Sequence, residues 1–136
     1  MGRRASREGV MKLLYQLELQ KDDRQEQIDL VLKDRSFTSN DKEYINDVVN
    51  GVYEHLEEID NMIQSALNGW MIDRISKIEL VVLRLSIYEL KYRADIPSKV
   101  TFNEAVELTK KYVGEDKTAF VNGLLGKYIG EDNCVV

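Results

Sequence analysis

SKIELVVLRLSIYEL, residues 76–90, is the stretch that decides the fold of this chain. Its apolar residues recur at helical spacing, at Ile78, Val81, Val82, Leu85 and Tyr88. Four more apolar residues, Leu80, Leu83, Ile87 and Leu90, lie off this stripe, so the predicted helix is apolar around most of its circumference. Ser76 and Glu79 form a capping-box pattern that marks its start. We expect this helix to be the central and most buried element of a helical protein.

Amphipathic patterns on both sides of this stretch predict further helices. The spacing predicts helices over about residues 4–20, 40–67, 99–112 and 117–129. It also predicts a short helix that ends near residue 34. Asn40 and Glu43 resemble a capping box at the start of the long helix, and Asn68-Gly69 should end it. A single turn is expected at 70–75. Gly51 interrupts the apolar stripe of the long helix, and we interpret it as a position of close packing.

The chain is therefore predicted to be all-α, with about seven helices. Its 136 residues suit a single domain, and one proline with eight glycines argues against many short strands. The simplest arrangement is two small bundles that share one core. The break at Asn68-Gly69 would separate an N-terminal bundle, about 4–68, from a C-terminal bundle, about 70–130.

Composition excludes most catalytic classes. One histidine, His55, and one cysteine, Cys134, leave no cysteine-based zinc site, no di-iron pattern and no internal disulfide. No phosphate-binding or dinucleotide-binding loop occurs, so we expect neither an enzyme nor a metal or cofactor. No apolar run reaches membrane-spanning length and no secretory signal is visible, so we expect a cytosolic protein without a membrane contact.

Charge is distributed unevenly along the chain. The net charge is −5, but residues 1–12 carry +3 and the remainder −8. Arg3, Arg4 and Arg7 are spaced to share one face at a helix start, where guanidinium groups and free backbone N–H groups suit phosphate oxygens. Cations are otherwise unfavourable there, which favours a ligand. The alternative is a frayed, solvated basic end.

Two other segments are candidates for binding. Residues 114–124 form a turn that opens a helix, and an exposed Phe120 could stack on an unpaired base. The apolar pattern alone favours the core for Phe120, and it favours helix packing for Gly123 and Gly126. Tyr15 lies off the main stripe of the first helix, on a second apolar strip that could cover another helix or a partner protein.

Several ordered motifs resemble the NusB family of transcription antitermination factors, nearly from end to end. The most specific are LRLSIYEL at 83–90, NEAVEL at 103–108 and FVNGLL at 120–125. The resemblance implies two perpendicular three-helix bundles and a non-catalytic bacterial factor. It further implies binding of single-stranded boxA RNA together with the ribosomal protein NusE. Such a complex joins RNA polymerase and the other Nus factors, and it promotes ribosomal RNA transcription.

The resemblance also assigns residues to each surface. Those expected at the RNA are Arg4 and Arg7, with Arg3 beside them, and Asp116, Lys117 and Phe120, which overrides the core preference for Phe120. Those expected at NusE are Tyr15, Glu18 and Glu79. Two alternatives stay open: a helical protein-interaction module without RNA binding, and an RNA-targeting domain of a ribosomal RNA methyltransferase, whose catalytic domain lies outside these residues. A homodimer that covers Tyr15 or the arginines is a further possibility.

Overall fold

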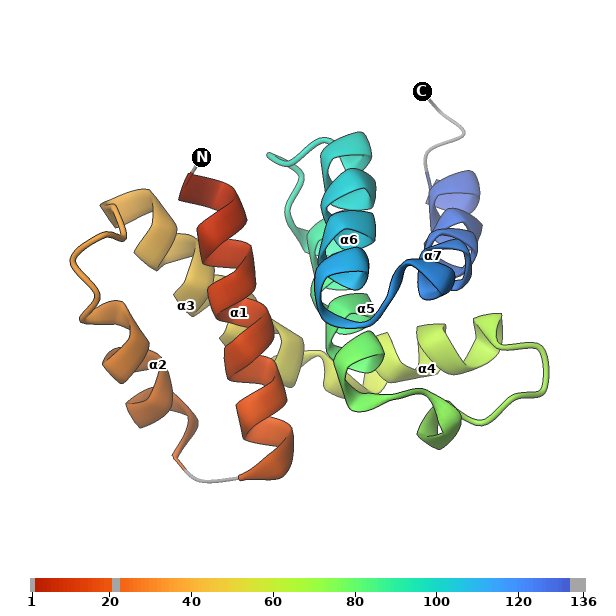
Figure 1. The fold of residues 1–136 in the computed structure, drawn as a ribbon, viewed down its shortest axis with the longest axis horizontal. Helices are drawn as coiled ribbons and strands as arrows, with labels where there is room; N and C mark the ends of the chain where they lie inside the picture. Colours follow the sequence, from red (N-terminus) through yellow and green to blue (C-terminus); the bar gives the residue numbers. More distant parts are fainter. Residues whose placement is uncertain (1, 21–22, 133–136) are drawn as a thin grey trace.

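The computed structural model describes residues 2–20 and 23–132, and in these the protein is helical without strands (Figure 1), which confirms the all-α prediction. Cys134 lies outside the described residues. The α-helices are α1 (Gly2–Leu19), α2 (Arg24–Leu32), α3 (Ser39–Glu54), α4 (Leu56–Ala66), α5 (Lys77–Tyr92), α6 (Ser98–Tyr112) and α7 (Thr118–Asp132). Two short 3₁₀ turns, η1 (Ile72–Arg74) and η2 (Glu115–Lys117), complete the order, and η1 confirms the single turn expected there.

Helix α5 is the centre of the structure, as its sequence predicts. Every residue from Glu79 to Glu89 is buried, because α1, α3, α4, α6 and α7 all pack against this helix. Each fully buried Leu, Ile or Val side chain stabilises the fold by about 1.5–3 kcal/mol relative to its exposed state. The Ser76–Glu79 capping box is present, with the backbone N–H of Glu79 donating to Ser76 Oγ over 3.2 Å.

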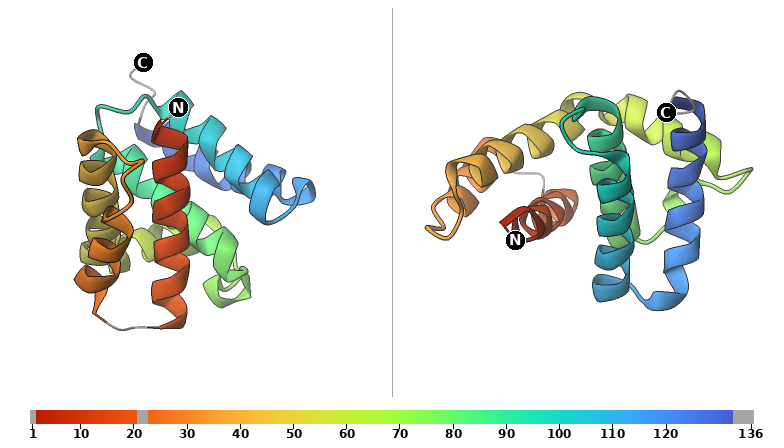
Figure 2. Two further views of the ribbon diagram at one scale, coloured as in Figure 1. Left: turned by 60° about the vertical axis from the view of Figure 1, so that its left-hand side comes forward. Right: turned by 90° about the horizontal axis from the view of Figure 1, so that it is seen from above.

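The remaining helices lie on two sides of α5. Helices α1, α2 and α3 pack together on one side of the molecule, and α4, α6 and α7 lie on the other (Figures 1 and 2). A single cluster of buried apolar side chains runs through both groups, from Val10 on α1 to Leu125 on α7. The perpendicular packing of two three-helix bundles stays a prediction.

The prediction of one long helix over 40–67 is wrong, because the helix is interrupted at His55 and divides into α3 and α4. His55 leaves the helical conformation (φ −116°, ψ 24°), and its ring stacks on Tyr92 at 4.3 Å between centroids. The apolar stripe continues across the break because both helices cover α5. Helix α4, however, also contacts α7, whereas α3 contacts α1 and α2. The chain therefore passes from one group of helices to the other at His55. The bundle bounds at Asn68-Gly69 stay a prediction.

The start of α3 also differs from its prediction. The capping box is formed by Thr38 and Asp41, two residues before the expected Asn40 and Glu43. Asp41 N–H donates to Thr38 Oγ1 over 3.1 Å, and Thr38 N–H donates to Asp41 Oδ2 over 2.9 Å. Glu43 instead pairs with Arg93 at 3.0 Å.

Three glycine positions give contrasting outcomes. A Cβ at Gly51 would lie 2.3 Å from the ring of Tyr88, so the predicted close packing is confirmed. Asn68 and Gly69 end α4 with φ values of 52° and 97°, which confirms the expected stop. Gly123, expected to serve helix packing, has no atom within 4 Å of a Cβ built on it, so that interpretation is wrong.

Candidate nucleic-acid interface

The three N-terminal arginines lie in different environments. Arg7 is 3% exposed and forms a two-point ion pair with Glu89 of α5, at 2.8 Å from Nε and 3.0 Å from Nη2. The expectation of one exposed face of three guanidinium groups is therefore wrong for Arg7. Its cation is used to neutralise a carboxylate in the core, because a buried charge without a partner is costly.

Glu89 is the centre of a buried polar network. Its carboxylate accepts hydrogen bonds from Arg7, from the Tyr44 hydroxyl and from Thr101 Oγ1, the last at 2.7 Å. Burial raises the pKa of Tyr44 well above its ordinary value, and the Glu89 charge raises it further. Burial lowers the pKa of Arg7, but the hydrogen bonds and charge of Glu89 outweigh this and leave it above its ordinary value. The network fixes the start of α1 against α3, α5 and α6.

Arg3 is half-buried and lies against an aromatic ring. Its guanidinium carbon is 4.4 Å from the centroid of Tyr44, within the range of a cation–π contact. Arg93 approaches the same ring at 5.5 Å. Arg3 is therefore held at the edge of the buried network, with less freedom to reach a ligand than a solvated arginine.

Arg4 is the exposed arginine of the three, with 57% of its side chain accessible. It forms a two-point ion pair with Glu104 of α6, at 3.0 Å from Nε and 2.7 Å from Nη2. The hydrogen bond from Arg4 holds the pKa of Glu104 below its ordinary value, although partial burial opposes this shift. A second pair one turn later, Glu8 with Lys111 at 2.6 Å, also joins α1 to α6.

A surface cavity connects Arg4 to the start of α7. Its volume is about 580 Å³, and Arg4, Glu104 and Glu107 line one part of it. Thr118, Ala119 and Asn122 line another part. The two segments expected at RNA, 114 residues apart in sequence at Arg4 and Thr118, therefore border one surface.

The loop before α7 is shaped by Gly114, whose φ of 150° is a conformation that favours glycine. Asp116 and Lys117 follow in the η2 turn, and both are exposed. Phe120 is 38% exposed, so the core position that the apolar pattern favoured is wrong. Val121, Leu124 and Leu125 occupy the core face instead. The exposure that base stacking requires is present.

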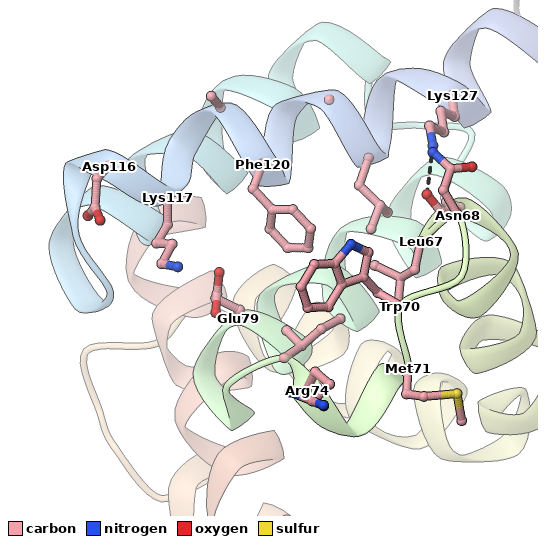
Figure 3. A pocket seen from close by; sticks show the side chains of 15 residues that line it. Leu67, Asn68, Trp70, Met71, Arg74, Glu79, Asp116, Lys117, Phe120 and Lys127 are labelled. Carbon is pink, nitrogen blue, oxygen red and sulfur yellow. Dashed lines mark hydrogen bonds between the residues drawn. The ribbon is translucent and has the colours of Figure 1, made fainter.

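Phe120 lies on the wall of a cavity with a volume of about 660 Å³ (Figure 3). Of the predicted site residues, Asp116, Lys117, Phe120 and Glu79 all line it. Glu79 is only 6% exposed, and its carboxylate accepts a hydrogen bond from Ser76 Oγ at 2.9 Å. The cavity adds Trp70 and Arg74, which were not among the predicted site residues.

Tyr15 lies in a second cavity, of about 420 Å³, between α1, the start of α5 and the end of α6. Leu19, 57% exposed, and Ile78 line the same cavity, and Tyr15 is partly buried, so the chain covers the second apolar strip on the first helix only in part. Ile78 lines this cavity and the adjacent Glu79 lines the larger one. The two candidate surfaces therefore meet at the start of α5.

Glu18, which was expected to contact NusE, forms an ion pair within the chain. It pairs with Arg84 at 2.8 Å, and Arg84 also binds Asp60 through two hydrogen bonds of 2.8 and 2.9 Å. Two carboxylates of the acidic stretch on α4, those of Glu58 and Asp60, therefore have partners within the chain. Glu58 pairs with Lys91 at 3.1 Å and accepts from the Tyr92 hydroxyl.

The position of Glu89 in the sequence indicates that it needs a cationic partner. Glu89 lies within the apolar helix that the sequence predicts to be central, where an ionised carboxylate requires a cation. Arginines expected on the surface were candidates for that cation. Trp70 carried a weaker signal, as an aromatic residue directly after a predicted helix end.

Two negative findings concern the residues that the structure describes. No helix there is long and apolar enough to span a membrane. No group of three or more His, Cys, Asp or Glu side chains in these residues is placed to hold a metal ion.

Comparisons with known proteins agree with one another. The model of the NusB family matches residues 4–129. The transcription antitermination protein NusB of Ruminiclostridium cellulolyticum is 61% identical over 127 residues, which cover 93% of this chain and 88% of that protein.

Solved structures give the same result at the level of the fold. T. maritima NusB superposes with a TM-score of 0.89 at 36% identity, covering 96% of this chain and 92% of that one. A structure of the antitermination factors NusB and NusE in complex with dsRNA matches with a TM-score of 0.84 at 29% identity, covering 95% and 96%. The chain therefore belongs to the NusB family of transcription antitermination factors, which are not enzymes.

Proposed function

We propose that this protein binds single-stranded boxA RNA jointly with the ribosomal protein NusE and thereby promotes transcription of ribosomal RNA. It would act in the cytoplasm, in an antitermination complex with RNA polymerase and the other Nus factors. The observation that carries the proposal is the shared surface of Arg4 and the start of α7. The exposed guanidinium of Arg4 on this surface would contact a phosphate. The exposed ring of Phe120, which follows Ala119 on α7 and lines the neighbouring cavity, would stack on a base.

The charges on this surface favour joint rather than solitary binding of RNA. Arg7 is buried and Arg3 is half-buried, so Arg4 and Lys117 are the exposed cations of the predicted set. Two phosphate contacts on a single strand give a slope of log affinity against log salt of about −1.4. So shallow a slope indicates few ionic contacts, and a second protein would add the remaining ones.

The cavity at Tyr15 suits the proposed NusE contact. It is apolar, it is next to the start of α5, and it is separate from the surface cavity at Arg4. Because Ile78 and Glu79 line adjacent cavities, a protein bound at Tyr15 would lie beside an RNA strand bound at Phe120. The solved complex of the related factors NusB and NusE with dsRNA supports joint binding of a protein and an RNA.

A binding titration tests the proposal. Fluorescence anisotropy of a labelled boxA strand would be measured with this protein alone, with NusE alone and with both. We expect the tightest binding with both proteins, and little binding to a scrambled strand. Binding of NusE without any gain in RNA affinity would instead indicate a protein-interaction module and contradict the proposal.

A further inference from the structure

Trp70 is a large apolar side chain that the fold leaves in solvent. It is the single tryptophan of the sequence, and 65% of it is exposed. Exposed tryptophans are uncommon, and they are frequent at binding surfaces because the indole offers a large rigid face. The indole faces the cavity that Phe120 also lines, and the two rings come from opposite walls (Figure 3).

The turn that carries Trp70 is held in place by specific hydrogen bonds. The side chain of Gln64 on α4 donates to the carbonyl of Trp70 at 2.6 Å and accepts from the N–H of Ile72 at 2.9 Å. The N–H of Trp70 donates to the carbonyl of Leu67 at 3.1 Å. On the opposite wall, Lys127 of α7 donates to the carbonyl of Ala66 at 2.6 Å. The indole is therefore presented from a fixed backbone rather than from a loose loop.

Unpaired cations lie at the rim of this cavity. Among the residues that the structure describes, the side chains of Arg74 and Lys117 form no ion pair and no hydrogen bond, and both are exposed. This contrasts with Arg4 and Arg7, which already bind carboxylates. Two free cations beside two exposed aromatic rings are suited to a ligand that combines flat aromatic groups with negative charge.

We propose that this cavity takes one unpaired base of the bound RNA strand, with the base stacked on Trp70 as well as on Phe120. Arg74 and Lys117 contact the phosphates on either side of that base. The inference rests on the proposed function, because it extends the RNA surface from Phe120 across the cavity to a turn that nothing else assigns to RNA.

Continuity favours RNA over a protein as the occupant. Asp116, Lys117 and Phe120 belong both to the predicted RNA segment and to the wall of this cavity. A strand that reaches Phe120 from Arg4 therefore arrives at the mouth of the cavity. The exposed carboxylate of Asp116 on the wall is an acceptor for the amino group of a base.

The single tryptophan provides a direct readout of this contact. Binding of an unlabelled boxA strand to the complex with NusE would be followed by Trp70 emission and, in parallel, by anisotropy of a labelled strand. The Trp70→Phe variant in the same mixture supplies the background emission from the partner. We expect RNA to change the Trp70 emission with the same midpoint as the anisotropy titration.

Variants separate the indole from general surface effects. Trp70→Ala should weaken RNA binding about tenfold, and Trp70→Phe should recover most of the affinity because a ring is retained. Leu30→Ala, which removes a comparably exposed side chain on α2 (58%), is the matched control and should bind normally. Circular dichroism of each variant would verify the fold.

Each outcome has a distinct meaning. RNA binding with unchanged Trp70 emission and a Trp70→Ala variant of normal affinity overturns the inference and leaves the proposed function intact. An emission change caused by NusE alone, without a further change on adding RNA, identifies the cavity as a protein contact and also overturns it. Absence of any RNA binding by the wild-type complex removes the proposed function and this inference with it.

Discussion

Arg7 on α1 and Glu89 on α5 form an ion pair with two hydrogen bonds, and the side chains are 3% and 0% exposed. The pair joins residues 82 positions apart, and Thr101 adds a bond from α6. Such a buried pair fixes the start of α1, and Arg4 lies less than one turn before Arg7. The exposed guanidinium of Arg4 is therefore positioned by a buried one.

Removing Arg7 should destabilise the fold strongly. In Arg7→Ala the Glu89 carboxylate stays buried without its cation, which costs about 3–5 kcal/mol in the free energy of unfolding. Urea denaturation followed by circular dichroism measures this. Adding Glu89→Gln to Arg7→Ala should recover part of the loss, because the amide still accepts from Thr101 but carries no charge. An Arg7→Ala variant of wild-type stability would contradict the structural role.

Two glycines make a matched pair for packing. Alanine at Gly51 places a Cβ 2.3 Å from the Tyr88 ring, and overpacking of this kind costs about 1–3 kcal/mol. Alanine at Gly123 meets no atom within 4 Å, and in a helix it should gain about 0.5–1 kcal/mol. Chemical denaturation of both variants checks the opposite signs, and a Gly51→Ala protein as stable as the wild type would disprove the close contact.

Glu104 should compete with RNA for Arg4. Glu104→Gln removes the charge that occupies the guanidinium, so we expect tighter RNA binding by a few-fold in the complex with NusE. Arg4→Ala should weaken binding and make the salt slope shallower by about 0.7. Anisotropy titrations at several salt concentrations measure both effects. Equal affinities of wild type and Arg4→Ala would exclude Arg4 from the RNA contact.

The same pair gives a pH-dependent signature. Arg4 holds the pKa of Glu104 below its ordinary value, so the pair stabilises the folded state above the pKa of the unfolded chain. This contribution is lost as the pH falls through the lowered folded-state pKa. NMR titration of the Glu104 carboxyl carbon should show the pKa rising in Arg4→Ala. An unchanged pKa in that variant would mean that the ion pair is absent in solution.

Tyr15→Ala should weaken NusE binding while leaving the fold and the RNA residues in place. The side chain is partly buried against the core and lines an apolar cavity, so its loss removes contact area that the proposed partner would use. Isothermal titration calorimetry with NusE measures the change. Leu30→Ala again serves as control, and an unaltered dissociation constant for Tyr15→Ala would place the NusE contact elsewhere.

Periodicity was sufficient to predict most helices, because a buried stripe at helical spacing is a local property of the chain. It failed at His55, where the apolar stripe continues although the helix does not, and where no glycine or proline marks the break. The start of α3 was misplaced for a related reason: Asn40 and Thr38 both precede an acidic residue by three positions.

The candidate site was less predictable, because it depends on contacts between distant segments. Nothing in the sequence near Arg7 or Arg4 indicates that one binds Glu89 and the other Glu104. The exposure of Phe120 could have been predicted from the sequence, because Val121, Leu124 and Leu125 already fill the core stripe of α7. The position of Trp70 opposite Phe120 requires the fold itself.

Photo-crosslinking tests the central claim most directly. A boxA strand carrying a photoreactive uridine at successive positions would be irradiated in complex with this protein and NusE, and the crosslinked peptides identified by mass spectrometry. The account predicts crosslinks in the peptides that contain Arg4 and residues 116–120, with Trp70 and Phe120 crosslinking from the same nucleotide. Crosslinks confined to α2 and α3, or to NusE alone, would contradict it.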